Sequence, residues 1–330
     1  MSKKINELNS KDIGLNNLRP KTLKDYIGQE KIKKMISISI EAAKNRNEAL
    51  PHQLFFGPPG LGKTTIACII ANEMNKNIKI VTGPSIEKTG DLVAILTGLN
   101  DGDILFIDEI HRLNRQIEEM LYPAMEDFSI DIVLKTGPTP KSVRINLPHF
   151  TLIGATTRAG MLSAPLRDRF AMINRMEYYT DIELTQVILR TSSILNIEID
   201  EKGALEIAKR SRGTPRLANR LINQVRDYTE VEYNQNIVTH DIVKEVLDFI
   251  GIDKDGLDSN DIAYLNAIWN VGKGSAVGLT TLSAALSEDI GSIEDMYEPY
   301  LFQSGFINKT PRGRVLTEKG MNHIGVKKEE

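Results

Sequence analysis

The sequence predicts an α/β fold with a parallel sheet, followed by a small all-α domain and a C-terminal winged helix. First, short apolar runs alternate with longer amphipathic segments up to about residue 180, which is typical of a mainly parallel sheet. Second, helical periodicity then replaces the strand signal. Third, three helical patterns near the end precede two short apolar runs around a basic turn, which together resemble a winged helix-turn-helix. We expect domains at 1–180, 181–252 and 253–330.

The bulk composition is that of an ordinary globular protein. The 330 residues are 41% hydrophobic and 26% charged, with a net charge of −3, so any contact with nucleic acid must come from local patches. The sequence has no apolar run long enough to span a membrane, and its first 15 residues do not resemble a secretion signal. Its single cysteine, Cys68, cannot form an internal disulfide, which fits a reducing compartment. We therefore expect a cytoplasmic protein.

The elements of the first domain follow from its apolar pattern. Apolar runs predict buried strands at Leu54–Phe56, Ile78–Val81, Ile104–Ile107 and Thr151–Ile153. Amphipathic segments between them predict helices near 64–74, 85–97 and 114–127. A further pair of runs, Ile130–Leu134 and Ser142–Leu147, flanks a Gly/Pro-rich stretch and predicts a protruding hairpin, with a plain surface loop as the alternative.

The two later domains are marked by a helix start and a polar break. Gly213–Arg216 predicts a helix start, with Thr214 as N-cap and Pro215 in the first helical position. Gly251–Ser259 is polar and contains glycine, so we expect a domain boundary there. Helical patterns near 260–270, 279–287 and 292–303 precede the wing at 305–317.

Nine residues, Gly57–Thr65, match the phosphate-binding pattern G-x-x-x-x-G-K-[ST] between an apolar strand and a helix. Its glycines let backbone N–H groups surround a polyphosphate, and the helix N-terminus adds a favourable dipole. We expect Lys63 to reach the outer phosphates of ATP and the Thr64 hydroxyl to bind Mg²⁺. The nucleotide-binding residues of this loop would be Gly60, Gly62, Lys63, Thr64 and Thr65.

An acidic pair ends the apolar strand Ile104–Ile107. The carboxyl ends of strands are where open α/β sheets bind ligands, so Asp108 is expected to organise the Mg²⁺ shell and Glu109 to act as general base on the attacking water. A solvated acidic turn is the alternative, and the phosphate loop disfavours it. Either Thr156 or Thr157, after the next strand, could contact the γ-phosphate through its hydroxyl.

Arginines supply the remaining candidates for the hydrolysis site. Arg167 and Arg169 lie in one short segment, where a guanidinium aimed at a neighbouring subunit's γ-phosphate would act as an arginine finger; the alternative is a surface ion pair with Asp168. Arg216, in the first turn of its helix, could reach a phosphate from the helical domain. In the wing, Lys309, Arg312 and Arg314 form a basic cluster within an otherwise acidic domain, which favours contact with DNA phosphates.

The ordered set of motifs closely resembles the RuvB family of AAA+ Holliday-junction branch-migration ATPases. The resemblance is carried by Leu18–Pro20, Asp25–Gln29, the phosphate loop, Asp103–Leu113, Gly154–Gly160, Arg167–Phe170, Gly213–Arg216 and Thr310–Arg314. It implies a large ATPase domain, a helical lid and a winged-helix head. It also implies hexameric rings on junction or duplex DNA that work with RuvA and RuvC in recombination and repair.

The resemblance also implies roles for single residues. Leu18, Arg19 and Tyr179 correspond to nucleotide-pocket residues, and Glu126, Asp127 and Phe128 to a segment that also lines that pocket. Arg169 corresponds to the arginine finger that acts in trans, Arg216 to the lid sensor and Thr157 to the first sensor, with Thr156 as a rival. Lys309 and Arg314, and by proximity Arg312, correspond to DNA contacts, and the hairpin 130–147 to the element that docks RuvA. Ala171 stands where glycine is expected, and Lys309 where arginine is common.

Three other functions fit parts of the pattern. A two-lobed helicase would share the acidic box, but it needs a second α/β lobe that the sequence lacks. A protein-remodelling ring would carry an aromatic pore residue, whereas no Phe, Trp or Tyr occurs between Phe56 and Phe106. A DNA-binding regulator that uses ATP as a switch would not need Glu109 and Arg169, because both serve hydrolysis.

Overall fold

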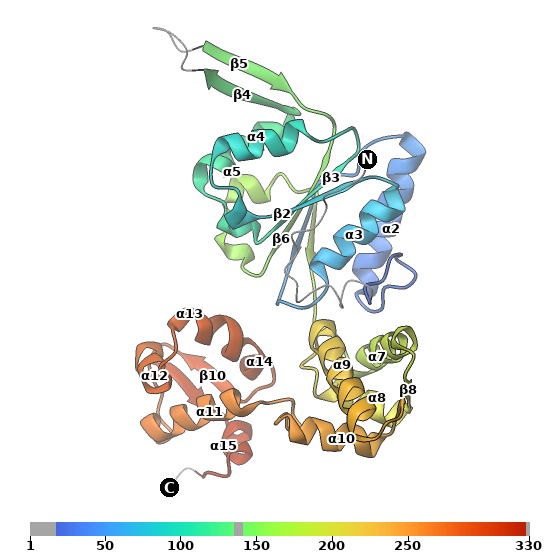
Figure 1. The fold of residues 1–330 in the computed structure, drawn as a ribbon. Helices are drawn as coiled ribbons and strands as arrows, with labels where there is room; N and C mark the ends of the chain where they lie inside the picture. The colour runs from blue at the N-terminus through green and yellow to red at the C-terminus, as the bar shows by residue number, and fades with distance from the viewer. Residues whose placement is uncertain (1–17, 135–140, 328–330) are drawn as a thin grey trace. The chain divides into compact units, whose positions relative to one another are not determined.

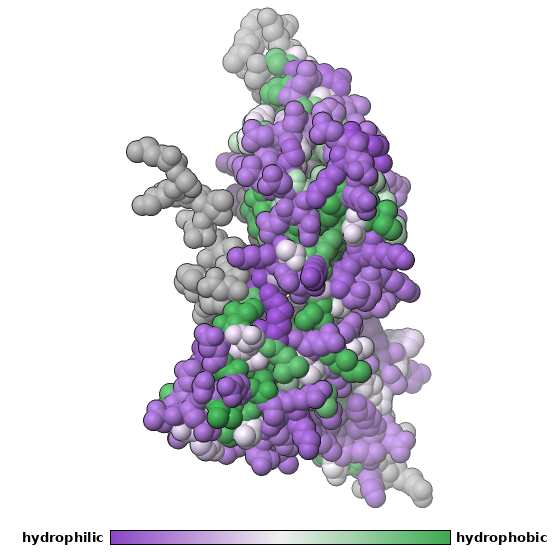
Figure 2. All heavy atoms as spheres, turned by 90° about the vertical axis from the view of Figure 1, so that its right-hand side faces the viewer, coloured by the Kyte–Doolittle hydropathy of each residue, from purple (hydrophilic) through white to green (hydrophobic). Residues whose placement is uncertain are grey.

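The computed structural model describes residues 18–134 and 141–327, and its contacts group the chain into two units, Met1–Glu183 and Leu184–Glu330. Each unit is described by itself. No helix within the described ranges combines the length and apolarity needed to cross a bilayer. Hydrophilic residues cover most of the face shown in Figure 2, and hydrophobic residues form smaller groups on it.

A parallel sheet is the centre of the first unit (Figure 1), with its strands in the order β2-β3-β6-β1-β7. The strands are β1 (Gln53–Phe56), β2 (Ile78–Thr82), β3 (Ile104–Asp108), β6 (Thr151–Thr156) and β7 (Met172–Arg175). β3 and β6 are central and almost wholly buried, as expected of parallel strands covered on both faces. The four expected strands are therefore present, and β7 is an additional edge strand.

Helices cover both faces of this sheet. In Figure 1, α2 and α3 lie on one side and α4 and α5 on the other. The helices are α2 (Glu30–Arg46), α3 (Lys63–Met74), α4 (Thr89–Thr97), α5 (Arg115–Glu126) and the short α6 (Ala164–Arg167), with 3-10 turns at Gly83–Ser85, Ile110–Arg112 and Ala159–Met161. The Asn114 side chain caps α5 by accepting a hydrogen bond from the Ile117 amide at 3.0 Å. The expected helices are present, and α2 was not foreseen.

The predicted hairpin is formed by β4 (Ser129–Leu134) and β5 (Lys141–Asn146), an antiparallel pair that projects from the sheet (Figure 1). Its base is anchored in the core by the fully buried Ile130. The predicted tip, residues 135–140, lies outside the described residues.

The first part of the second unit is the helical lid. Its helices are α7 (Asp181–Leu195, which begins in the first unit), α8 (Glu201–Lys209), α9 (Pro215–Glu232) and α10 (His240–Phe249), and its short parallel strands are β8 (Glu198–Ile199) and β9 (Ile237–Val238). α9 begins at Pro215 as predicted. Thr214 occupies the N-cap position, but its hydroxyl donates to the Ser211 carbonyl instead of capping the helix, so the predicted side-chain cap is wrong.

The head follows, with its own hydrophobic core. Its elements are α11 (Ser259–Gly272), α12 (Leu279–Leu286), α13 (Ile290–Ser292), the π-helical turn η4 (Ile293–Tyr297), α14 (Glu298–Gln303), β10 (Ile307–Thr310), β11 (Gly313–Leu316) and α15 (Glu318–His323). β10 and β11 pair antiparallel and form the expected wing. Asp258 and Asp261 form a capping box at the start of α11.

Candidate functional site

The phosphate loop and the acidic pair meet at the carboxyl edge of the sheet. β6 lies between β1 and β3, with Phe56 level with Thr156, and Ile107 level with Gly154. The loop that leaves β1 and the carboxylate that ends β3 therefore flank the end of β6. This is the edge at which open α/β sheets bind ligands.

The backbone of the phosphate loop requires glycine. Gly57, Gly60 and Gly62 have φ of +145°, +82° and +99°, a region that side chains disfavour. A Cβ on Gly57 would lie 2.6 Å from the Met176 carbonyl oxygen, and one on Gly62 would lie 2.8 Å from the Tyr26 hydroxyl. The loop is thus a bare backbone concavity at the start of α3, which suits a polyphosphate.

The Lys63 side chain lies within this concavity. Its ammonium donates to the carbonyls of Gly57 and Pro58 at 2.8 Å each, and the residue is 8% exposed. Thr64 and Thr65 follow in the first turn of α3 and are partly exposed. A buried ammonium at the N-terminus of a helix fits an anionic ligand, and the structure brings the predicted loop residues together.

The acidic pair has a constrained backbone. Asp108 accepts a hydrogen bond from the Glu109 amide at 2.9 Å, and Glu109 has a left-handed φ of +49°. The Glu109 carboxylate pairs with Arg112 at 3.0 Å. Asp108 therefore offers a carboxylate at the end of β3, where it could bind a cation that is also bound by Thr64. The half-exposed Glu109 carboxylate could accept a proton.

The two threonines after β6 differ in environment. Thr156 is buried, and its hydroxyl contacts His111 Nδ1 at 2.9 Å and accepts from the Arg158 amide at 2.9 Å. Thr157 is exposed. His111 was not among the predicted site residues, and its contact links the turn after Glu109 to the end of β6. Which hydroxyl senses the γ-phosphate remains a prediction.

Tyr26 and Tyr179 lie beneath the phosphate loop. The Tyr26 hydroxyl donates to the Leu61 carbonyl at 3.3 Å and accepts from the Tyr179 hydroxyl at 3.0 Å. Burial raises the pKa of Tyr179 to about 12, so both rings stay neutral and act as hydrogen-bonding supports. Leu18 is 3% exposed. Burial raises the pKa of the Cys68 thiol on α3, and the charge of Arg19 opposes this shift. Sequence reasoning named Leu18, Arg19 and Tyr179 but missed Tyr26.

Arg169 lies at the opposite edge of the sheet from the phosphate loop. It precedes β7, and because β7 runs parallel to β1, this position is at the amino edge. The guanidinium donates to Glu126 at 2.9 Å and to the Pro165 carbonyl at 2.7 Å, and it lies 4.5 Å from the Tyr122 ring centroid. The predicted alternative was a surface ion pair with Asp168, but the Arg169 guanidinium pairs with Glu126. A strand of four residues is roughly 13 Å long, so Arg169 cannot reach its own phosphate loop.

Glu126, Asp127 and Phe128 also lie at the amino edge. The Phe128 ring is near those of His52 and Phe150, which immediately precede β1 and β6. Glu126–Phe128 therefore lie away from the phosphate loop of their own chain, and their assignment to a nucleotide pocket stays a prediction. The topology allows these residues to approach a nucleotide only on a neighbouring copy.

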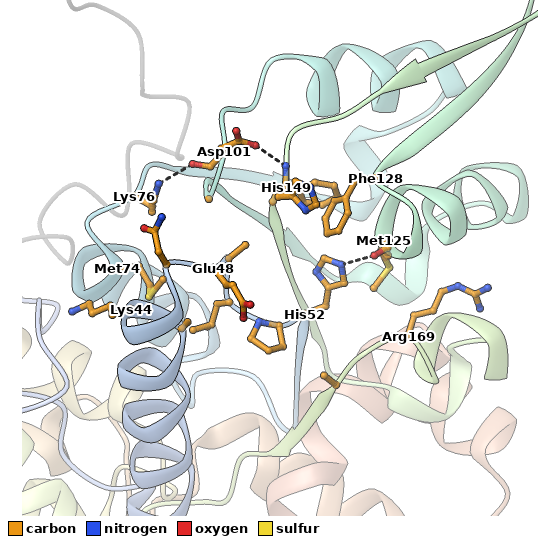
Figure 3. A pocket seen from close by; sticks show the side chains of 18 residues that line it. Lys44, Glu48, His52, Met74, Lys76, Asp101, Met125, Phe128, His149 and Arg169 are labelled. Carbon is orange, nitrogen blue, oxygen red and sulfur yellow. Dashed lines mark hydrogen bonds between the residues drawn. The ribbon is translucent and has the colours of Figure 1, made fainter.

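A cavity of about 900 Å³ opens at this amino edge (Figure 3), lined among others by His52, Phe128, His149 and Arg169. The His52 ring is held by the Met125 carbonyl and the Leu152 amide, so it has a structural role. In Figure 3 the Arg169 side chain extends away from His52 and Phe128. Because the phosphate loop is at the other edge, the cavity is separate from the nucleotide site.

Within the second unit, Arg216 and the wing lie on different domains. Arg216 is exposed in the first turn of α9. Lys309 and Arg312 are exposed on the wing, at the end of β10 and in the turn that follows. These three positions are exposed, and their contacts with phosphates stay predictions.

Arg314, by contrast, is not a surface residue of the wing. Its side chain is 7% exposed and donates to both carboxylate oxygens of Glu298, at 2.5 and 2.9 Å, and to Glu294 at 3.2 Å. Glu298, itself 4% exposed, also accepts from the Tyr264 hydroxyl at 2.7 Å. Arg314 therefore does not lie in the exposed basic surface of the wing, because its charge neutralises a buried glutamate, and its contact with DNA stays a prediction.

We accordingly expect Arg314→Ala to destabilise the head by roughly 3–5 kcal/mol, the usual cost of leaving one member of a buried ion pair alone. Trp269, the single tryptophan, packs against the head core and makes its fluorescence a reporter of head unfolding in the full-length protein. Arg312→Ala is the control and should unfold like the wild type. An unchanged Trp269 transition in Arg314→Ala would contradict the burial argument.

A phosphate loop after one strand of a parallel sheet, an acidic pair on the strand two places away in that sheet and a following helical lid define an AAA+ ATPase. The description "Holliday junction DNA helicase RuvB P-loop domain" matches residues 18–176, the RuvB AAA lid domain matches 179–253 and the RuvB C-terminal winged helix domain matches 254–325. The chain therefore belongs to the RuvB family and is an ATP hydrolase.

Solved structures agree with this assignment. The structure described as the Thermotoga maritima RuvB Holliday junction branch migration motor is 47% identical, with a TM-score of 0.86, over 94% of this chain and 99% of that one. A single-residue variant of the Thermotoga maritima protein gives 48% identity and a TM-score of 0.87 over the same shares. The similarity thus extends through the ATPase domain, lid and head.

Proposed function

We propose that this protein is an ATP-driven motor that moves Holliday junctions during recombination and repair, as a hexameric ring acting with RuvA and RuvC. The observation that supports it most is the separation of Arg169 from the phosphate loop of its own chain. A site that needs both groups can be completed only between two copies in head-to-tail contact, and such contacts form a ring when the rotation from copy to copy closes.

In this proposal, ATP lies on the loop Gly57–Thr65, and Thr64 and Asp108 would hold Mg²⁺, which would offset the charge of the phosphates. Glu109 accepts the proton of the attacking water. Arg169 of the neighbouring copy, accompanied by Glu126–Phe128, approaches the γ-phosphate. Arg216 of the lid senses the same group, so that hydrolysis changes the position of the lid.

The hairpin of β4 and β5 is the proposed docking element for RuvA. Ile130 and Ile132 pair with Ile145 and Val143, so the four apolar side chains share one face of the hairpin. Val143 is 41% exposed, away from the buried base. An apolar face without core neighbours at its outer end suits a protein partner.

The wing is the proposed DNA contact, through Lys309 and Arg312. Replacing both by alanine should weaken duplex binding and reduce the slope of log K against log salt by about 1.8, since each phosphate contact contributes about 0.9. The measurement is duplex affinity across a salt series, with Lys244→Ala, an exposed lid lysine on α10, as the control. A slope equal to that of the wild type would show that these two residues do not contact phosphates.

The proposal as a whole is tested with a synthetic four-way junction, purified RuvA and ATP. The expected results are separation of the junction into duplexes and stimulation of ATP turnover by junction DNA. If junction DNA leaves turnover unchanged and no duplexes form, the motor function is wrong, even though the chain is an ATPase.

A further inference from the structure

The segment between lid and head, residues 250–258, is a folded joint and not a flexible linker. Asp253 accepts hydrogen bonds from the amides of Asp255 and Leu257 through one carboxylate oxygen, at 2.9 Å each. The Asp253 amide donates to the Leu257 carbonyl, and the Gly256 amide donates to the Asp253 carbonyl. Leu257 is 1% exposed and belongs to the head core. The polar composition that predicts a domain boundary therefore encodes a tight turn.

The lid contacts residues 250–258 through Arg210. The Arg210 side chain is 2% exposed and donates to the Ile252 carbonyl at 2.7 Å, while Glu206 and Asp248 neutralise its charge. The lid backbone also packs directly on the joint. A Cβ on Gly256 would lie 2.9 Å from the Arg210 carbonyl oxygen, so this position has no room for a side chain.

The head also contacts residues 250–258, through Tyr300 and His323. The Tyr300 hydroxyl donates to the Asp255 carbonyl at 2.6 Å. His323, at the end of α15, lies between two carboxylates, with Nε2 at 2.7 Å from Asp253 and Nδ1 at 3.2 Å from Asp255. Both ring nitrogens of His323 are thus occupied by the joint, which ties the last helix of the head to it.

Arg212 joins lid and head directly. From the lid, its guanidinium donates to the Gly256 carbonyl at 2.6 Å, pairs with Asp258 at 3.2 Å and with Asp261, and lies 5.2 Å from the Tyr300 ring centroid. Asp261 is 1% exposed. Burial raises the pKa of Asp261 to about 6, and the charge of Arg212 opposes this shift. Removing Arg212 would leave a buried charge unpaired.

Arg212, which contacts the head, lies close in sequence to Arg216, the proposed nucleotide sensor. Arg212 precedes Arg216 by four residues, and the start of α9 lies between them. The residue that pairs with the head is therefore on the segment that also carries the proposed nucleotide sensor. If this segment shifts and the head does not, the ion pairs of Arg212 with Asp258 and Asp261 break. The head must therefore shift together with the segment.

We propose that Arg212 locks lid and head into one rigid arm, so that the head follows every movement of the start of α9. The rigidity follows from the contacts that Arg210, Arg212, Tyr300 and His323 make with residues 250–258. The use of the arm to move DNA rests on the proposed function. In this role Arg212 is a positioning residue that touches neither nucleotide nor DNA.

The rigid arm is tested by a distance measurement in the full-length protein. Because Cys68 is the single cysteine, Cys68→Ser allows selective spin labelling at Val231→Cys on α9 and Met296→Cys in the head, positions that are 79% and 70% exposed. Labelled chains are diluted with unlabelled protein so that pulsed electron resonance reports pairs within one chain. We expect one narrow distribution with the same mean without nucleotide, with ADP and with a non-hydrolysable ATP analogue. A mean that changes with nucleotide, or a broad distribution, would overturn the proposal.

The role of Arg212 is tested by Arg212→Gln in the same labelled background. We expect a broadened distribution and a loss of at least about tenfold in junction separation per ATP, within the usual range of coupling between sites. Basal ATP turnover and duplex affinity should change much less. Arg226→Gln is the matched control, because Arg226 lies on α9 but pairs with Asp227 and Glu230 inside the lid.

A second variant keeps the test decisive if Arg212→Gln does not fold. Asp258→Ser retains an N-cap for α11 but removes one carboxylate partner of Arg212, and it should broaden the distribution to a smaller extent. Unchanged distributions in both folded variants, or unchanged junction separation despite broadening, would refute the role of Arg212. If wild-type protein itself fails to separate junctions, the proposed function is wrong, while the distance measurement still decides whether the arm is rigid.

Discussion

Glu109→Gln should reduce ATP turnover by about 10²–10⁴-fold, the usual contribution of a positioned general base. The substitution keeps the size of the side chain and its ability to accept a hydrogen bond from Arg112, which lies 3.0 Å away. It removes only the basic carboxylate. ATP affinity should therefore stay close to that of the wild type, because the phosphate loop and Asp108 are unchanged.

The measurement combines steady-state phosphate release with equilibrium binding of a fluorescent ATP analogue. Glu119→Gln is the matched control, since Glu119 is a half-exposed glutamate of α5 that pairs with Arg115. Its turnover should equal that of the wild type. If Glu109→Gln retains turnover, another group takes the proton. A parallel loss of nucleotide binding would instead mean that Glu109 shapes the pocket.

Arg169→Ala should lower ATP turnover by about 10³–10⁵-fold, the range typical of arginine fingers. Within one chain, only some of the nitrogen donors of the Arg169 guanidinium have hydrogen-bond partners among the described residues. Glu126 and the Pro165 carbonyl hold its terminal nitrogens, whereas its buried Nε has no hydrogen-bond partner among the described residues. Exchange of Glu126 for a more highly charged phosphate is electrostatically favourable, so the finger is available to a neighbouring copy.

The trans role is separated from a structural role by mixing variants. Lys63→Ala lacks a working phosphate loop, and Arg169→Ala lacks the finger, so each variant alone should be inactive. Mixed rings contain sites that combine an intact loop from one copy with an intact Arg169 from another, and activity should reappear. Arg167→Ala, at an exposed arginine of the same short segment, should be fully active. Two inactive variants that stay inactive on mixing would contradict action in trans.

The parts of the site that sequence reasoning predicted correctly are local. The phosphate loop needs glycine at positive φ followed by a helix start, and the acidic pair needs only a buried strand before it, so a few consecutive residues determine each geometry. The four predicted strands and their parallel arrangement also followed from the alternation of apolar runs. These features depend on neighbours in sequence, which the sequence displays directly.

The features that were missed depend on partners distant in sequence. Arg314 looks like a wing cation until Glu298, on another element of the head, is known to bind it. Tyr26 reaches Leu61, 35 residues away, through a hydroxyl that any tyrosine could carry. The segment 250–258 has the composition of a linker, and its rigidity comes from Arg210, Arg212, Tyr300 and His323, which no local pattern connects to it. Long-range pairing of this kind cannot be read from spacing alone.

The placement of Arg169 and the phosphate loop at opposite edges of one sheet has a consequence for how the protein behaves at low abundance. A single chain carries both halves of a hydrolysis site but can never join its own two halves. Under the proposed assembly, the rate per chain depends on protein concentration, since dilution dissociates the contacts that complete each site. Free chains therefore consume almost no ATP, and consumption begins where many copies gather, for example on DNA that recruits them. The geometry of the sheet thus limits ATP hydrolysis by unassembled chains without any separate inhibitor.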